Sequence, residues 1–212
     1  MQAWHFIADD RKLAYPQADG SRPVITPGLV LTEERPLSLC HVGLHASVRA
    51  IDAMQYAQGA VICRVECEGE IVHGDDKLCC SRRTVLWMAD ATRVLHLFAC
   101  DVAEEALALV GNPDPRSVAA IAAKRDWLDG KIDDAQFDAA WDAARAAASY
   151  AASDAAWDAA RAAARAAASY AASDAASDAA WAAAWAAAWA ASAARASQNT
   201  RLERMLSELE PS

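Results

Sequence analysis

Sulfur and imidazole groups stand close together in the string CHVGLHAS, which begins at Cys40. Cys40, His41 and His45 are residue types that can ligate zinc or act as a nucleophile and its base. A zinc site needs about four ligands, and the sequence shows no second cluster with suitable spacing. A nucleophile pair needs an orienting third group and an oxyanion site, and neither is evident. We therefore treat the three residues as ligand-binding candidates and expect no metal and no cofactor.

A charged loop, GDDK, adds Asp75, Asp76 and Lys77 to the candidate ligand-binding residues. Its polar side chains could position a ligand, and the alternative is an ordinary solvated turn. The carboxylates of Glu66 and Glu68 alternate along a predicted strand, so they share one face. They are either solvated or, under a cleft, a pair of acids able to serve transfer chemistry.

The cysteines indicate a reducing compartment. All six lie in the first half, without a Cys-x-x-Cys pair and without the even spacing of a small secreted scaffold: Cys40, Cys63, Cys67, Cys79, Cys80 and Cys100. The first residues also lack a basic start followed by a sustained apolar run. We therefore expect reduced thiols in a cytoplasmic protein, with Cys63 and Cys67 packing in the core.

The charge composition argues against nucleic acid as a partner. Lys and Arg number 20 against 29 Asp and Glu, which gives a formal net charge of -9 at pH 7. A chain this acidic has no general electrostatic attraction for phosphates. The uncharged stretch 179–194 is shorter than the roughly 20 apolar residues that cross a bilayer, and alanine is only weakly apolar. We therefore expect no nucleic-acid partner and no membrane segment.

Residues 1–110 are predicted to form a small α+β domain that positions the candidate groups. Apolar and polar residues alternate in the string VICRVECE, the period of a half-buried strand. Ser47 is a suitable N-cap for a helix that Gly59 would end. The predicted elements are strands at about 4–8, 29–32 and 61–68 and helices at about 47–59 and 92–109. The pattern of RRTVLWMAD does not distinguish a strand from the start of a helix, so both predictions are kept for this segment.

Residues 111–212 are predicted to form a second domain that is all-α and rich in alanine. Between residues 137 and 192 the sequence divides into fourteen tetrads, and their third and fourth positions are alanine in 27 of 28 cases. Alanine has the highest helix propensity, and no Gly or Pro interrupts these tetrads. Flanking helices are expected from Pro115 to a stop at Gly130, from Asp133 or Asp134 onward, and at 198–210, where an amphipathic segment closes the domain.

The four-residue period bears on how these helices are arranged. At 3.6 residues per turn each tetrad shifts the marked position by about 40°, so no single face of a helix stays apolar. A continuous helix of about 84 Å would bury little surface. We therefore expect antiparallel helices in a bundle or helical array, with a long supercoil or rod as the alternative. Trp181, Trp185 and Trp189 nearly share a face and are candidates for the bundle core or for a partner-binding stripe.

The string LCHVGLHASVRAIDAMQYAQGAVICRVECEGEIVHGDDKLCC resembles a small domain of unknown function met in phage, prophage and bacterial proteins. That family has a Cys-x-x-Gly-(Leu or Phe)-His-Ala core, a following helix and an acidic strand. The resemblance covers about residues 3–100. It implies common ancestry with this family, for which no activity is established. Separately, the alanine tetrads with their QNTRLERML ending resemble the helical region of bacterial immunity proteins.

A third similarity is to the ADP-ribosyltransferase and RNA 2′-phosphotransferase folds, carried by the strings GLHAS, AMQY and VICRVEC. This resemblance implies that His5 or His45 faces nicotinamide or ribose. It also implies that Glu66 or Glu68 is the catalytic acid.

Together these features favour a non-enzymatic interaction protein of phage or mobile-element type. Its small recognition domain and helical scaffold would bind or sequester a bacterial protein partner such as a toxin, an immunity protein or a defence component. The reason is an elaborate helical array without a complete catalytic set. The first alternative is a nucleotide or ADP-ribose transferase with a small nucleotide ligand. The second is a self-assembling helical rod, and a homo-oligomer is open under either interpretation.

Overall fold

The computed structural model describes residues 1–16, 20–109, 113–149 and 192–211. These residues form two compact units, Met1–Thr92 with Asn199–Ser212 and Arg93–Gln198. The last segment of the chain therefore belongs to the same unit as the first. Most of the alanine tetrads, and with them Trp181, Trp185 and Trp189, lie outside the described residues.

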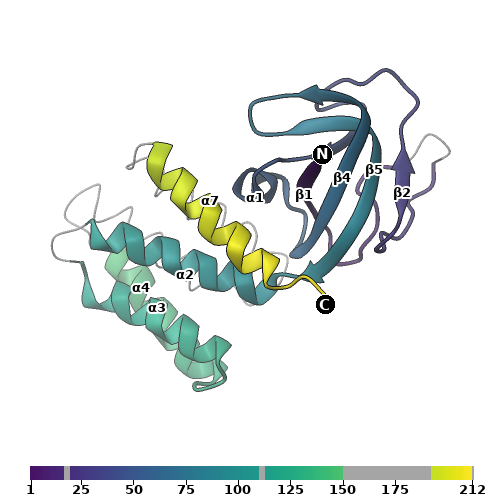
Figure 1. Ribbon diagram of the computed structural model, residues 1–212. Coiled ribbons are helices and arrows are strands. Elements are labelled where there is room, and N and C mark those ends of the chain that lie inside the picture. Colours follow the sequence, from purple (N-terminus) through teal and green to yellow (C-terminus); the bar gives the residue numbers. More distant parts are fainter. Residues whose placement is uncertain (17–19, 110–112, 150–191, 212) are drawn as a thin grey trace. The chain divides into compact units, whose positions relative to one another are not determined.

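The first unit is built around an antiparallel sheet (Figure 1). Its strands are β1 (Gln2–Ile7), β2 (Val30–Thr32), β3 (Leu44–Ala46), β4 (Val61–His73) and β5 (Leu78–Asp90). The order across the sheet is β1-β4-β5-β2, and β3 pairs with β5 at a different part of that strand from β2. The hairpin of β4 and β5 is the centre of the sheet because each of the other strands pairs with one of these two.

The sheet closes on itself through the residue that follows β3. Ser47 and Trp4 exchange two backbone hydrogen bonds, with N···O distances of 2.8 and 2.9 Å. Since β3 also pairs with β5, it connects β5 to β1 and the strands enclose an inner face. The register of β4 against β5 shifts after Arg64 and again after Glu68, and such irregularities let long strands bend.

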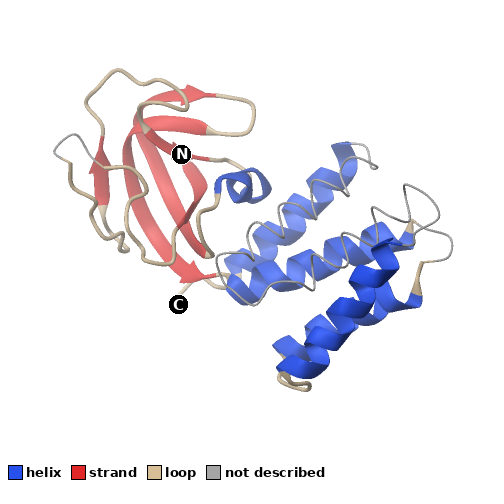
Figure 2. Ribbon diagram, turned by 180° about the vertical axis from the view of Figure 1, so that it is seen from behind, coloured by secondary structure: helices blue, strands red, loops and turns tan. Residues whose placement is uncertain are grey.

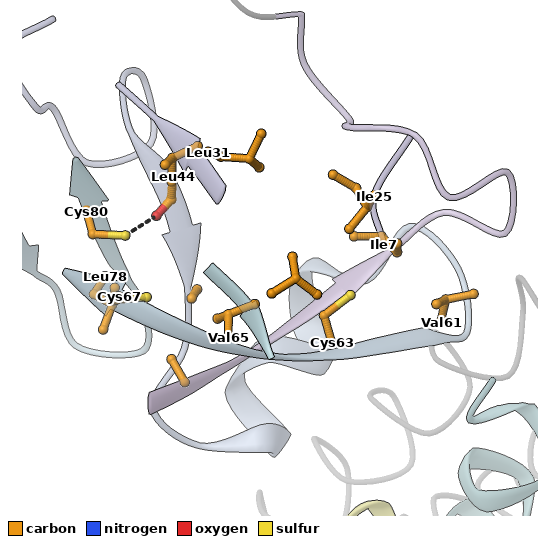
Figure 3. Close-up of a cluster of buried hydrophobic side chains, with 13 residues drawn as sticks. Ile7, Ile25, Leu31, Leu44, Val61, Cys63, Val65, Cys67, Leu78 and Cys80 are labelled. Carbon is orange, nitrogen blue, oxygen red and sulfur yellow. Dashed lines mark hydrogen bonds between the residues drawn. The ribbon is translucent and has the colours of Figure 1, made fainter. Parts of the chain in front are cut away.

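The inner face is apolar because alternate residues of each strand point to it. Figure 3 shows Cys63, Val65 and Cys67 of β4 among the side chains of this cluster. The cluster consists of Ala3, Ile7, Ile25, Leu31, Leu44, Ala46, Val61, Cys63, Val65, Cys67, Leu78, Cys80 and Val85. The strand predicted at 61–68 is confirmed, and so is the packing role of Cys63 and Cys67, which are fully buried.

A short helix, α1 (Ala50–Ala53), follows the closure of the sheet and continues as a 3-10 turn over Met54–Tyr56. The first backbone N–H groups of a helix have no acceptor within the helix. In α1 a side chain from the far end of the sequence accepts one of them: the amide of Ile51 donates to Oδ1 of Asn199 at 3.1 Å. The C-terminal segment thus caps a helix that starts 148 residues earlier.

That segment is the end of helix α7 (Ser192–Ser207). Glu203 accepts a second bond, from the amide of Ala50, with an N···O distance of 3.2 Å. Leu202 and Leu206 on the same helix are fully buried. The C-terminal segment therefore contributes both apolar burial and helix capping.

The second unit holds most of α2 (Thr92–Ala108), together with α3 (Pro115–Leu128), α4 (Asp134–Ser149) and the start of α7, drawn as coils in Figure 2. Asp114 caps α3 by accepting from the amide of Arg116. Asp133 and Gln136 accept from each other's amides in a reciprocal capping box that starts α4. The helices predicted at 92–109, from Pro115 to a stop at Gly130, and from Asp133 or Asp134 are confirmed.

The predicted fold class, an α+β N-terminal domain followed by an all-α, alanine-rich bundle, is wrong. Up to Asp90 the first unit is an antiparallel sheet in which α1 and one 3-10 turn are the helical parts of the described residues. The predicted helix at 47–59 shortens to 50–56 because Ser47 pairs with Trp4 instead of capping a helix. The open segment RRTVLWMAD is strand, since it pairs with β4 along its length.

The helical half also differs from its prediction. The described helices α2, α3, α4 and α7 form no all-α alanine-rich bundle and show no clear helical repeat. Only the first tetrads, within α4, are among the described residues. Within the described ranges, none of the helices combines the length and the hydropathy needed to cross a membrane.

Candidate functional site

The loop before β3 carries Cys40 and is held by a histidine at its far end. Nε2 of His45 accepts a hydrogen bond from the backbone amide of Cys40, with an N···N distance of 3.0 Å. Nε2 is therefore engaged with the backbone of this loop, and the imidazole must be neutral to accept there.

The electrostatic surroundings of His45 favour the same neutral form. Partial burial lowers its pKa below 6.5, and the positive charges of Lys77 and Arg83 lower it further. A hydrogen bond with the backbone of Gly43 acts in the opposite direction. His45 thus positions the loop, and its Nε2 is taken up by that role.

Two residues of the loop have positive φ angles. Cys40 has φ of 71°, a conformation that residues with a Cβ rarely adopt. Gly43 has φ of 130°, and a Cβ placed there would lie 2.8 Å from Cβ of Cys79. Glycine is therefore required at position 43, whereas at Cys40 the fold maintains a strained backbone under an exposed side chain.

The turn between β4 and β5 lies against this loop. Its Gly74 has no room for a Cβ, which would lie 2.6 Å from Cδ2 of Leu39. Nζ of Lys77 is 4.2 Å from the centroid of the Tyr56 ring, and the Tyr56 hydroxyl donates to Oδ2 of Asp76 at 2.6 Å. A hydrogen bond with Cys40, and a weaker contribution from Tyr56, raises the pKa of Lys77.

These side chains form what we call the loop–turn surface. It consists of Cys40, His41, Tyr56, Asp75, Asp76 and Lys77. The structure brings Cys40, Lys77 and Asp76 together through Tyr56, which the sequence analysis did not select. His41 and Asp75 are exposed on the same loop and turn. The sequence gives no signal for Tyr56, because a tyrosine just after a short helix looks like an ordinary core residue.

The residues considered for transfer chemistry do not share a face of the sheet. His5 is in register with Cys63 on the inner face. Burial lowers its pKa well below 6.5. Glu66 and Glu68 alternate to the other face, and Glu68 accepts from Arg82 at 3.1 Å in an exposed ion pair. His5 and these two carboxylates therefore lie on opposite sides of β4.

The inner face contains one charged residue that the sequence analysis missed. Arg83 is only 2% exposed and donates from Nη1 to the carbonyl of His45, while its Nε has no hydrogen-bond partner in the described chain. Its register partner on β4 is Cys67, which fixes it on the core side. Hydrogen bonding from Cys67 and the charge of Arg83 lower the pKa of Cys80 to about 7, against the effect of burial. The sequence held one signal for this position: Arg83 lies two residues from Val85, so the two side chains share one face of the strand.

This interior cluster has thiols, an imidazole and a guanidinium, but solvent does not reach its thiols. Cys63, Cys67 and Cys80 are fully buried. In the residues that the structure describes, no group of three or more His, Cys, Asp or Glu side chains could hold a metal ion. The exposed chemistry of this unit therefore lies at the loop–turn surface.

The comparisons with known proteins give one family match and no activity. A family model described as "Domain of unknown function (DUF7666)" matches residues 21–97. The match contains β2, β3, β4 and β5, and it leaves out β1 and the C-terminal segment. No curated protein and no solved structure matches the chain.

Proposed function

We propose that this chain is an interaction protein that recognises a protein partner with the loop–turn surface. The single observation that carries the proposal is the fixation of this surface: Nε2 of His45 holds the Cys40 loop by accepting from its backbone amide. A recognition surface that is already ordered loses little conformational entropy on binding. Backbone strain kept under an exposed side chain is typical of functional loops.

The exposed side chains of the loop–turn surface are of types that contribute to protein–protein binding. Tyr56 is 45% exposed, and tyrosine is enriched among the residues that contribute most to binding. Lys77 and Asp76 flank it with opposite charges, which select a partner of complementary pattern. The proposal includes a bacterial partner, which would be a toxin, an immunity protein or a defence component. It also includes a cytoplasmic location and a phage or mobile-element origin.

The experiment compares two double variants of the full-length protein. Tyr56→Ala with Lys77→Ala removes the centre of the loop–turn surface. Tyr15→Ala with Lys12→Ala makes the same chemical change elsewhere, at exposed residues. Immobilised protein is exposed to bacterial lysate, and bound proteins are identified by mass spectrometry.

We expect the wild type and the Lys12/Tyr15 variant to retain the same protein, and the Tyr56/Lys77 variant to lose it while its melting temperature is unchanged. Equal retention by both variants would contradict the role of the loop–turn surface. A wild-type protein that retains nothing beyond bare resin would contradict the proposed function itself.

A further inference from the structure

A row of three large side chains crosses the outer face of the sheet. Arg64 of β4 is in register with Trp4 of β1 on one side and with Trp87 of β5 on the other. The two indole rings meet edge to face with their centroids 5.9 Å apart. The guanidinium carbon of Arg64 lies 4.3 Å from the centroid of the Trp4 ring. Because both indoles are nearly buried, at 4% and 8% exposure, the row is held rigidly.

This row lines a pocket of about 210 Å³. The other lining residues are Gln2 and Leu86 from the sheet and Ser207 and Glu210 from the C-terminal segment. Drug-sized ligands occupy pockets of about 300–1,000 Å³, so this one has room for a smaller molecule. All of its walls belong to the first unit.

Arg64 lines this pocket and has bonding capacity that no described residue uses. Its Nε donates to Oε1 of Gln2 at 3.3 Å, whereas Nη1 is buried without a hydrogen-bond partner in the described residues. A buried donor without an acceptor is costly, so an anionic group that approaches the guanidinium through the pocket would stabilise it. Burial lowers the pKa of Arg64, opposed by the nearby carboxylates of Glu203 and Glu210.

Glu210 supplies a charge of the opposite sign. It lines the same pocket as Arg64, yet the two side chains form no ion pair in the part of the chain that the structure describes. A bare anion would be attracted by Arg64 and repelled by Glu210, and a bare cation would meet the reverse. A ligand that carries both charges a few atoms apart is complementary to both residues.

We infer that this pocket binds the zwitterion of a free α-amino acid. The carboxylate accepts from the guanidinium of Arg64, the ammonium group donates to Glu210, and the carbon atoms lie against Trp4 and Trp87. The inference stands apart from the proposed partner recognition, since it uses neither the loop–turn surface nor a second protein.

The test is calorimetry of the full-length protein with a panel of the common L-amino acids at neutral pH. We expect at least one of them to bind. Its N-acetyl and its amide derivatives, each of which lacks one charge, should bind at least about tenfold more weakly. Arg64→Gln and Glu210→Gln should each reduce the affinity by a similar factor.

Glu208→Gln is the matched control, because this exposed carboxylate lies two residues from Glu210 and does not line the pocket. It should bind like the wild type. Glu210 is itself exposed, so its variant remains informative even if Arg64→Gln does not fold. Equal binding of acetate or of the N-acetyl derivative, full affinity in Glu210→Gln, or no heat from any amino acid at millimolar concentration would each overturn the inference.

Discussion

Replacing His45 by alanine tests whether this histidine holds the loop that carries Cys40. The substitution removes the acceptor of the Cys40 amide, which lies 3.0 Å from Nε2. Such a bond contributes about 1 kcal/mol net to stability. We therefore expect the free energy of unfolding to fall by about 1 kcal/mol near neutral pH.

The effect should depend on pH in a defined direction. Burial, then Lys77 and Arg83, lower the pKa of His45 in the folded protein below 6.5. The folded state therefore binds fewer protons at this site than the unfolded state, and the stability that His45 contributes is present above pH 6.5. It is lost as the pH falls from there through the folded-state pKa. The difference between wild type and His45→Ala should shrink over the same range.

Urea-induced unfolding followed by tryptophan fluorescence at several pH values measures this difference. His41→Ala is the matched control, since His41 is exposed on the same loop and, among the residues that the structure describes, its imidazole forms no hydrogen bond to that backbone. The pKa of His5 is lowered mainly by burial and then by Arg83, which all three proteins share, so these contributions cancel; His45→Ala removes only the smaller contribution of His45. A loss of stability that is the same at every pH, or that His41→Ala reproduces, would refute the reasoning.

Three further predictions concern other parts of the fold. Gly43→Ala should lower the free energy of unfolding by roughly 2 kcal/mol or more, measured by urea titration, because the new Cβ would lie 2.8 Å from Cβ of Cys79 at a φ of 130°; wild-type stability would disprove it. Asn199→Ala should cost about 1 kcal/mol in the same assay, since Ile51 loses its cap, and an unchanged urea midpoint would show that the C-terminal segment does not cap α1. His96 is 2% exposed, and burial lowers its pKa to about 4. Between pH 6.5 and about 4 the free energy of unfolding of the wild type should therefore fall by about 3 kcal/mol more than that of His96→Leu. Parallel pH profiles for the two proteins would exclude this.

Several elements could be predicted from the sequence because their signals are local. The alternation of Val61, Cys63, Val65 and Cys67 identifies a strand and its buried face without knowledge of its neighbours. Pro115 likewise indicates the start of a helix, since capping depends on residues within one turn. The candidate loop residues were found in the same way, from a short string with unusual chemistry.

The parts that could not be predicted depend on residues distant in sequence. Ser47 looks like a helix cap until Trp4 is seen to pair with its backbone. Arg83 looks like a surface charge until its register with Cys67 places it inside the sheet.

The sequence by itself determined the starts of α3 and α4, the buried face of β4 and the composition of the loop that carries Cys40, because each depends on residues within a few positions. Only the tertiary structure decided that the sheet closes, that His45 is spent on its own loop, and that Asn199 caps a helix 148 residues earlier. The physical reason is that a backbone hydrogen bond between distant segments leaves no pattern in either segment alone. Its partners are chosen by strand register and packing, which exist only once the chain has folded.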